Sequence, residues 1–154
     1  MRALLALLFA MIALSGCAST PQASRERDAE AKRFLPRPDA AVIYVYRDDF
    51  PTIGGESSND SVLYVNDRLI GATLPMIFFR FDVRAGEHLL RGVARDQGRL
   101  TLNTRDGELY FVSLQVVGGR SVFRLVDAET GKRDILRCCS LMENWEPGQR
   151  PFLR

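Results

Sequence analysis

The stretch that decides the fold is IFFRFDV, from Ile77 to Val83, because its outer and inner positions alternate regularly. Alternation with a period of two places successive side chains on opposite faces of a β-strand. A similar alternation returns in LYFVSLQVV, from Leu109 to Val117. The two stretches therefore predict strands that supply eight core positions: Ile77, Phe79, Phe81, Val83, Tyr110, Val112, Leu114 and Val116.

Six further runs rich in Val, Ile, Tyr, Phe and Leu are separated by residues typical of turns. They span residues 41–47, 61–65, 68–74, 88–94, 100–104 and 121–126. Eight short strands within roughly ninety residues are typical of a sandwich. The predicted fold class is therefore all-β, with a single antiparallel β-sandwich. Asn66–Asp67 and Arg84–Glu87 are expected to form hairpin turns.

Two segments at the ends of this β region need separate predictions. Ala41–Tyr46 is apolar on both faces, which favours either a central strand covered on both sides or a strand whose tyrosine hydroxyls reach water. Asp127–Arg137 begins with an N-cap residue and contains several good helix formers. A short C-terminal helix is thus slightly favoured there over a last strand.

The amino-terminal residues have the pattern of a targeting signal. Arg2 precedes twelve consecutive apolar residues, Ala3–Leu14, which are too few to cross a bilayer but suit a secretory signal. The next residues complete the motif LSGC, Leu14–Cys17, which resembles the lipobox of bacterial lipoproteins. The resemblance implies that residues 1–16 are a signal peptide and that Cys17 carries lipid. Because Ala18 rather than Asp follows, it also implies an outer-membrane protein that faces the periplasm.

Composition divides the rest of the chain into three parts. Residues 17–40 comprise the lipidated Cys and a polar segment with three Pro, expected to be a flexible tether, within which Arg25–Arg33 could form one or two helical turns. Residues 41–139 are expected to form the β-sandwich domain, and residues 140–154 a C-terminal tail. The formal net charge of +2, from 21 Lys plus Arg and 19 Asp plus Glu, excludes the strongly basic footprint of a nucleic-acid binder.

Several motifs resemble those of bacterial lipoproteins that carry domain of unknown function 2846. They are AVIYVYR, LYVNDRLIGAT, FDVRAGEHLL, TRDGELYFVSLQVV and FRLVDAETGKRDIL, in this order between Ala41 and Arg137. The chain is also similar to PEGA-type β modules, with Asp67 in place of the turn Gly. The resemblance implies a compact sandwich of prealbumin-like or immunoglobulin-like type. It implies no established activity and no catalytic residues.

The sequence holds few groups suited to catalysis. His88 is the only histidine, so a zinc site built on several imidazoles is impossible and a His-based triad would depend on this one residue. A structural, hydrogen-bonded ring is the favoured interpretation of His88. No phosphate-binding loop, dinucleotide fingerprint or calcium-loop spacing occurs in the sequence. We therefore predict that the protein is not an enzyme and takes no metal or cofactor.

Cys138 and Cys139 are adjacent and form a candidate redox pair. Their Cα atoms must lie about 3.8 Å apart, below the range of about 4.4–6.8 Å that is usual for a disulfide. Three possibilities stay open: one or both residues buried and reduced, a strained bridge between the neighbours, and an intermolecular disulfide.

These features together predict a non-enzymatic, membrane-tethered accessory of the cell envelope, which binds an unidentified envelope protein or cell-wall partner. Phe50, Ile53 and Phe78 are the candidate partner surface, because solvent-facing aromatic and apolar residues near loops are favoured at interfaces. The alternative is a small carrier whose strands close into a barrel around an apolar ligand. An enzyme would need His88 in a cleft beside a carboxylate or Ser.

Overall fold

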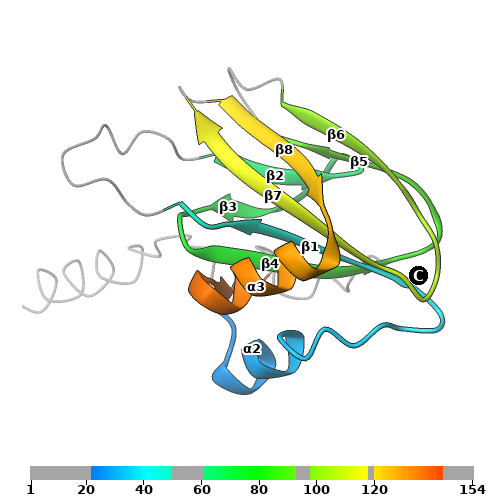
Figure 1. Cartoon of the computed structure of the whole chain (residues 1–154). Helices are drawn as coiled ribbons and strands as arrows, with labels where there is room; N and C mark the ends of the chain where they lie inside the picture. Colours follow the sequence, from blue (N-terminus) through cyan, green and yellow to red (C-terminus); the bar gives the residue numbers. More distant parts are fainter. Residues whose placement is uncertain (1–21, 50–60, 93–97, 118–119, 144–154) are drawn as a thin grey trace, which may run out of the picture.

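The computed structural model describes residues 22–49, 61–92, 98–117 and 120–143. Two β-sheets face each other, and two helices lie on the outer side of one of them (Figure 1). The helices are α2 (Arg25–Ala31) and α3 (Ala128–Cys138). The strands are β1 (Ala41–Arg47), β2 (Ser61–Val65), β3 (Arg68–Thr73), β4 (Ile77–Val83), β5 (Gly86–Arg91), β6 (Arg99–Thr104), β7 (Leu109–Val117), β8 (Arg120–Val126) and β9 (Ser140–Leu141). The predicted all-β sandwich and short C-terminal helix are confirmed.

The two sheets differ in how their strands pair. One contains five strands in the order β8-β7-β1-β4-β9, and the other contains four in the order β3-β2-β5-β6. The four-stranded sheet is antiparallel throughout, whereas β1 runs parallel to β7 and β4 runs parallel to β9. The predicted antiparallel sandwich is therefore found, with these two parallel pairs as the exceptions. The intervening strands form the long crossovers that parallel pairs require.

The space between the sheets is filled by a hydrophobic core. Seven of the eight predicted core residues are buried, and Tyr110 is half-buried against the same cluster. Leu63, Ile70, Leu90 and Leu102 complete the cluster from the four-stranded sheet. The described strands thus form two separate sheets over a packed core rather than the closed barrel that an apolar-ligand carrier would need.

β1 is covered on both sides, as one of the two interpretations of its sequence predicted. Ile43 and Val45 face the core between the sheets, whereas Tyr44 and Tyr46 belong to a second cluster beneath α2 and α3. The Tyr44 hydroxyl donates to the carbonyl oxygen of Ala31 at 2.9 Å, and the Tyr46 hydroxyl donates to Asp134 Oδ2 at 3.0 Å. Both hydroxyls therefore bond within the protein.

Residues 22–40 belong to the folded domain, so the predicted flexible tether is wrong for this range. Ser24 caps α2 by accepting a hydrogen bond from the Arg27 amide at 3.3 Å. Phe34 is buried, with its ring centroid 5.3 Å from that of Tyr44 and 5.7 Å from that of Phe111. Phe34 thus packs this polar segment against aromatic rings that β1 and β7 present. Residues 17–21 lie outside the described residues.

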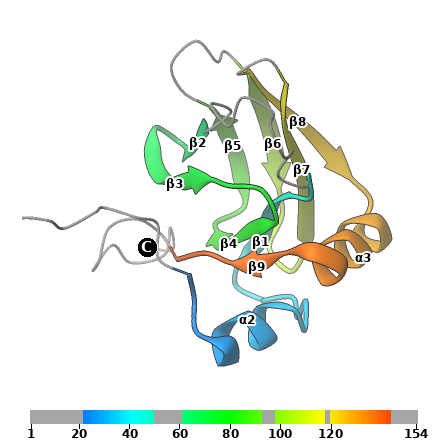
Figure 2. The same cartoon turned by 90° about the vertical axis from the view of Figure 1, so that its left-hand side faces the viewer.

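Hydrogen bonds and an ion pair join the beginning and the end of the described chain. The Ala23 amide donates to the Leu141 carbonyl at 2.9 Å, and the Leu141 amide donates to Asp28 Oδ1 at 2.8 Å. Arg27 and Glu143 form an ion pair. Figure 2 shows β9 running beside β4, with α2 below it. Of the predicted tail, residues 140–143 thus belong to the domain, and residues 144–154 lie outside the described ones.

Candidate functional site

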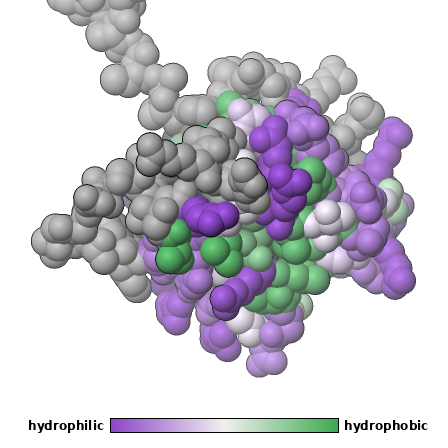
Figure 3. Space-filling model, turned by 90° about the horizontal axis from the view of Figure 1, so that it is seen from above, coloured by the Kyte–Doolittle hydropathy of each residue, from purple (hydrophilic) through white to green (hydrophobic). Residues whose placement is uncertain are grey.

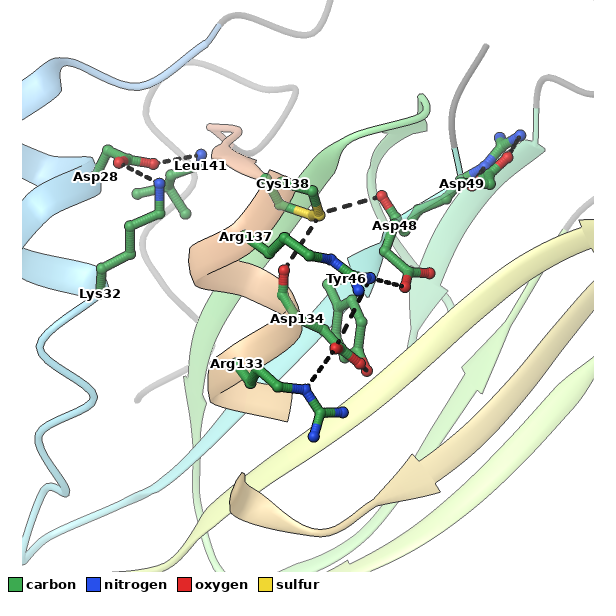
Figure 4. Close-up of a disulfide and its surroundings, with 12 residues drawn as sticks. Asp28, Lys32, Tyr46, Asp48, Asp49, Arg133, Asp134, Arg137, Cys138 and Leu141 are labelled. Carbon is green, nitrogen blue, oxygen red and sulfur yellow. Dashed lines mark hydrogen bonds and ion pairs between the residues drawn. A yellow bond between two sulfur atoms is a disulfide. The ribbon is translucent and has the colours of Figure 1, made fainter. Parts of the chain in front are cut away.

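Cys138 and Cys139 are bonded to each other at the end of α3, immediately before β9 (Figure 4). Of the three possibilities for this pair, the bridge between neighbours is the one found. Cys138 is the last residue of α3, and Cys139 is the C-cap, whose amide donates to the Ile135 carbonyl at 3.0 Å. The bridge therefore marks the point where the chain leaves the helix and becomes extended.

The two sulfur atoms have different surroundings. Cys139 is buried in the second cluster, with 2% of its surface exposed, whereas Cys138 is partly exposed. Cys138 Sγ lies 3.3 Å from the Asp134 carbonyl oxygen, and Cys139 Sγ lies 3.6 Å from the Arg47 carbonyl oxygen. A disulfide sulfur has no hydrogen, so these oxygens would accept hydrogen bonds from the sulfurs only in the reduced form.

A network of charged and polar groups surrounds the bridge. Asp134 is buried and accepts the Tyr46 hydroxyl, while Arg133 Nε lies 3.3 Å from its other oxygen. Arg137 Nη2 reaches Asp48 Oδ2 at 3.1 Å and so connects α3 to the end of β1 (Figure 4). Burial, helped by the hydrogen bond to the Asp134 carboxylate, raises the pKa of the Tyr46 phenol well above its usual value.

The electrostatics of this site favour a structural bridge. A reactive cysteine needs its thiolate stabilised by a helix N-terminus or a nearby cation. Cys138 instead lies at the C-terminus of α3, where the helix dipole is negative and disfavours a thiolate. The use of Cys138 and Cys139 as a redox pair stays a prediction.

His88 is fixed in the turn region as a structural residue. Its Nε2 lies 2.8 Å from the Arg84 carbonyl oxygen, which only accepts, so Nε2 donates. Nδ1 then accepts from Asn66 Nδ2 at 2.8 Å, and Asn66 Oδ1 in turn accepts from the Leu89 amide at 3.0 Å. Nδ1 thus holds the β2–β3 turn to β5, and Nε2 holds β5 to Arg84 in the turn that precedes it.

Phe78 does not belong to an exposed partner surface. It lies in the second cluster with 0% of its surface exposed, and Lys32 Nζ is 5.7 Å from its ring centroid. Alternation assigned Phe78 correctly to the face of β4 opposite the core, but α2 and α3 cover that face, and β9 pairs with β4 at the sheet edge. Phe50 and Ile53 lie outside the described residues, so their part in a partner surface stays a prediction.

Three exposed apolar regions were not predicted from the sequence. Leu35, in the turn after α2, has 52% of its surface exposed, and Val117, at the end of β7, has 63%. The outer face of the four-stranded sheet carries half-exposed apolar side chains at Val62, Tyr64, Leu69 and Leu89. Period two in β2 and β5 was the signal that could have identified this face.

In the described part of the chain, His, Cys, Asp and Glu side chains nowhere gather in a group of three or more suited to a metal ion. None of the helices in residues 22–49, 61–92, 98–117 and 120–143 has the length and apolar character needed to span a bilayer.

The fold and this site define a class: a two-sheet β-sandwich with two helices over one sheet and a disulfide between neighbouring cysteines. The chain belongs to the same family as an uncharacterized protein of Haemophilus influenzae. The two are 35% identical over 129 residues, which cover 79% of this chain and 74% of the relative. No family model matches the chain, and no solved structure matches it.

Proposed function

We propose that the protein is a lipoprotein of the outer membrane that faces the periplasm and binds an envelope partner without catalysing a reaction. The observation that carries the proposal is the motif LSGC, which ends at Cys17 directly after a short apolar segment. Membership of the lipoproteins with domain of unknown function 2846 is part of the same proposal.

The distance from the anchor to the domain supports a role close to the membrane. Five peptide units separate Cys17 from Gln22, the first described residue, and they can span at most about 18 Å. The sandwich would therefore lie next to the bilayer that holds the lipid. A partner would meet it there rather than at the end of a long tether.

The outer face of the four-stranded sheet is the surface we assign to the partner. Its half-exposed apolar side chains, Val62, Tyr64, Leu69 and Leu89, adjoin Arg91, whose guanidinium carbon lies 4.4 Å from the Tyr64 ring centroid. Figure 3 looks at a different part of the surface, the end of the sandwich opposite α2, and shows hydrophobic residues gathered there with hydrophilic residues around them. Apolar patches with a polar rim are typical of interaction sites.

The anchor is tested first. Cells expressing the full chain or its Cys17→Ala variant are labelled with an alkyne analogue of palmitate and then fractionated. We expect label and outer-membrane recovery for the full chain, and loss of both for the variant. A full chain that is unlabelled and soluble would overturn the lipoprotein proposal.

The partner surface is tested by crosslinking in intact cells followed by mass spectrometry. The double variant Val62→Asp with Leu89→Asp should lose the main crosslinked species because it charges the outer face of the four-stranded sheet. The matched control, Val117→Asp with Leu125→Asp, charges exposed apolar positions on β7 and β8 of the five-stranded sheet. Circular dichroism confirms that each variant folds, and an unchanged crosslink pattern in the first variant would exclude this face.

A further inference from the structure

We propose that α2 and the turn that follows it form a docking surface for the phospholipid headgroups of the membrane in which the anchor is inserted. The inference rests on the proposed lipidation of Cys17 and adds to it an orientation of the domain. In this orientation Leu35 enters the headgroup region, and Arg25 and Arg33 contact lipid phosphates.

The position of α2 in the chain and in space supports this choice of face. α2 begins at Arg25, eight residues after the proposed anchor. In both ribbon views it lies at the lower end of the molecule, while the β7–β8 end lies at the top (Figures 1 and 2). The hydrogen bond between Ala23 and Leu141 holds the entering chain against the domain. The anchor therefore pulls this end, rather than the opposite one, toward the bilayer.

The turn after α2 separates an inward side chain from an outward one. Phe34 has a left-handed backbone, with φ of 50°, and its ring is buried beside Tyr44 and Phe111. A bulky residue adopts this conformation only where its surroundings hold it. The adjacent Leu35 is left 52% exposed, between the exposed Arg33 and Pro36. An exposed leucine beside arginine suits the boundary between headgroups and acyl chains.

Most charges on this surface are already paired within the protein. Lys32 pairs with Asp28, Arg27 with Glu143, and Arg37 with Asp39 and Asp82. The exposed Arg25 and Arg33 make no ion pair among the described residues, and their guanidinium groups can contact phosphate. Exposed Glu26 and Glu30 keep the surface near neutrality, so it does not bind membranes by charge alone. The anchor supplies the affinity, and the surface selects the orientation.

Depth-dependent fluorescence quenching tests the inference on the lipidated chain in vesicles of phosphatidylethanolamine and phosphatidylglycerol. Trp145, the only Trp, is replaced by Phe, and Leu35→Trp provides the reporter. The matched control is Val117→Trp, an exposed apolar residue that ends β7, and this end of β7 lies opposite α2 in Figure 1. With brominated lipids, we expect quenching at position 35 at least about threefold stronger than at position 117. Equal quenching at the two positions would overturn the inference.

Three further variants keep the test from depending on one substitution. Ala29→Trp places a second reporter on the exposed side of α2 and should also be quenched more than Val117→Trp. Arg25→Glu with Arg33→Glu should lower quenching at position 35, whereas Arg120→Glu with Arg124→Glu, on exposed β8 positions, should not. Equal effects of the two charge reversals would contradict a specific face.

The same experiment separates the inference from the proposed function. Because Cys138 and Cys139 are bonded to each other, Cys17 is the one thiol left for attachment of a maleimide lipid. Mass spectrometry of the protein from cells tests the natural lipid, and the maleimide-linked protein tests the docking. Quenching at position 35 with the synthetic anchor supports the docking surface even if Cys17 carries no natural lipid. Without quenching, the docking surface is wrong even if that lipid is present.

Discussion

At the scale of single residues, the two tyrosines of β1 show how polar hydroxyl groups can be buried between a strand and two helices. Each hydroxyl finds an acceptor on the helical side: the Ala31 carbonyl for Tyr44 and the Asp134 carboxylate for Tyr46. Burial raises the pKa of both phenols. A buried hydroxyl without such an acceptor would cost about 1–3 kcal/mol, so these two bonds help to hold α2 and α3 in place.

Tyr46→Phe should lower the free energy of unfolding by about 1.5–3 kcal/mol at neutral pH, since it removes a buried hydrogen bond to a charged group. Urea denaturation followed by circular dichroism measures the loss. Tyr64→Phe is the matched control, because Tyr64 is half-exposed on the outer face of the four-stranded sheet. A loss equal to that of the control would show that the Tyr46 hydroxyl does not stabilise the fold.

The difference in stability between the wild type and Tyr46→Phe should depend on pH, and the raised pKa of Tyr46 fixes its direction. The pKa of Tyr46 is raised in the folded state, so the phenol's contribution is fully present below the unfolded pKa of about 10 and is lost as the pH rises above it. The advantage of the wild type over Tyr46→Phe should therefore shrink above pH 10, by at most about 1.4 kcal/mol per unit. A difference that stays constant from pH 9 to pH 11 would contradict the raised pKa.

At the scale of elements, α3 packs so closely on β7 that one position has no room for a side chain. A Cβ atom at Gly131 would lie 2.4 Å from atoms of the Phe111 ring and its Cβ. Gly in a helix interior normally costs about 1 kcal/mol relative to Ala, so intrinsic helix propensity argues against it here. The close approach to Phe111 explains why the helix contains a residue that its own propensity disfavours.

Gly131→Ala should therefore destabilise the protein, although Ala is the better helix former. Relief of the overlap requires α3 or Phe111 to shift, and overpacking of this kind typically costs about 1–3 kcal/mol. Glu129→Ala, at an exposed position of the same helix, controls for propensity and should be nearly neutral. Thermal unfolding compares the two variants, and a Gly131→Ala protein that is more stable than the wild type would exclude the close packing.

Reduction of the bridge between Cys138 and Cys139 should change stability little. The loop it closes contains only the two cysteines, so the entropy that the unfolded chain gains when the bridge opens lowers the free energy of the unfolded state by only about 1 kcal/mol. The two thiols would also gain the carbonyl oxygens of Asp134 and Arg47 as acceptors. Melting with and without a phosphine reductant, with thiols counted by a chromogenic assay, tests this expectation. A shift above about 8 °C would show that the bridge holds the end of α3 in place.

Local patterns predicted the elements well because a period of two and an N-cap are properties of a few neighbouring residues. The predicted bounds of β1, β2, β4 and β7 agree with the structure, and Asp127 caps α3 through a bond from the Thr130 amide at 2.9 Å. Asn66 and Asp67 both have left-handed backbones, as a tight hairpin turn requires. The burial of the outer face of β4 was not predictable from local patterns. Phe78 and Asp82 are buried there by residues that are distant in the sequence.

The candidate site was only partly predictable for the same reason. Adjacent cysteines are visible in the sequence, but their bridge depends on where α3 ends, and Leu35 becomes an exposed position only because Phe34 turns inward. A polar segment with one docking aromatic residue has the composition of a linker. Composition therefore predicted a tether, whereas aromatic contacts with β1 and β7 make the segment part of the domain.

At the scale of the whole molecule, the domain should begin at residue 22 rather than at residue 41. Without α2 and the following turn, Tyr44 and Phe111 lose Phe34, and the Tyr44 hydroxyl loses its acceptor on Ala31. Loss of a buried phenylalanine alone costs about 3–5 kcal/mol, a large part of the 5–15 kcal/mol typical of a domain. Residues 22–154 should therefore unfold cooperatively, while residues 41–154 should bind a hydrophobic dye and melt broadly. Phe34→Ala in the longer chain should fall between them. Equal melting temperatures for residues 22–154 and 41–154 would show that the domain begins at residue 41.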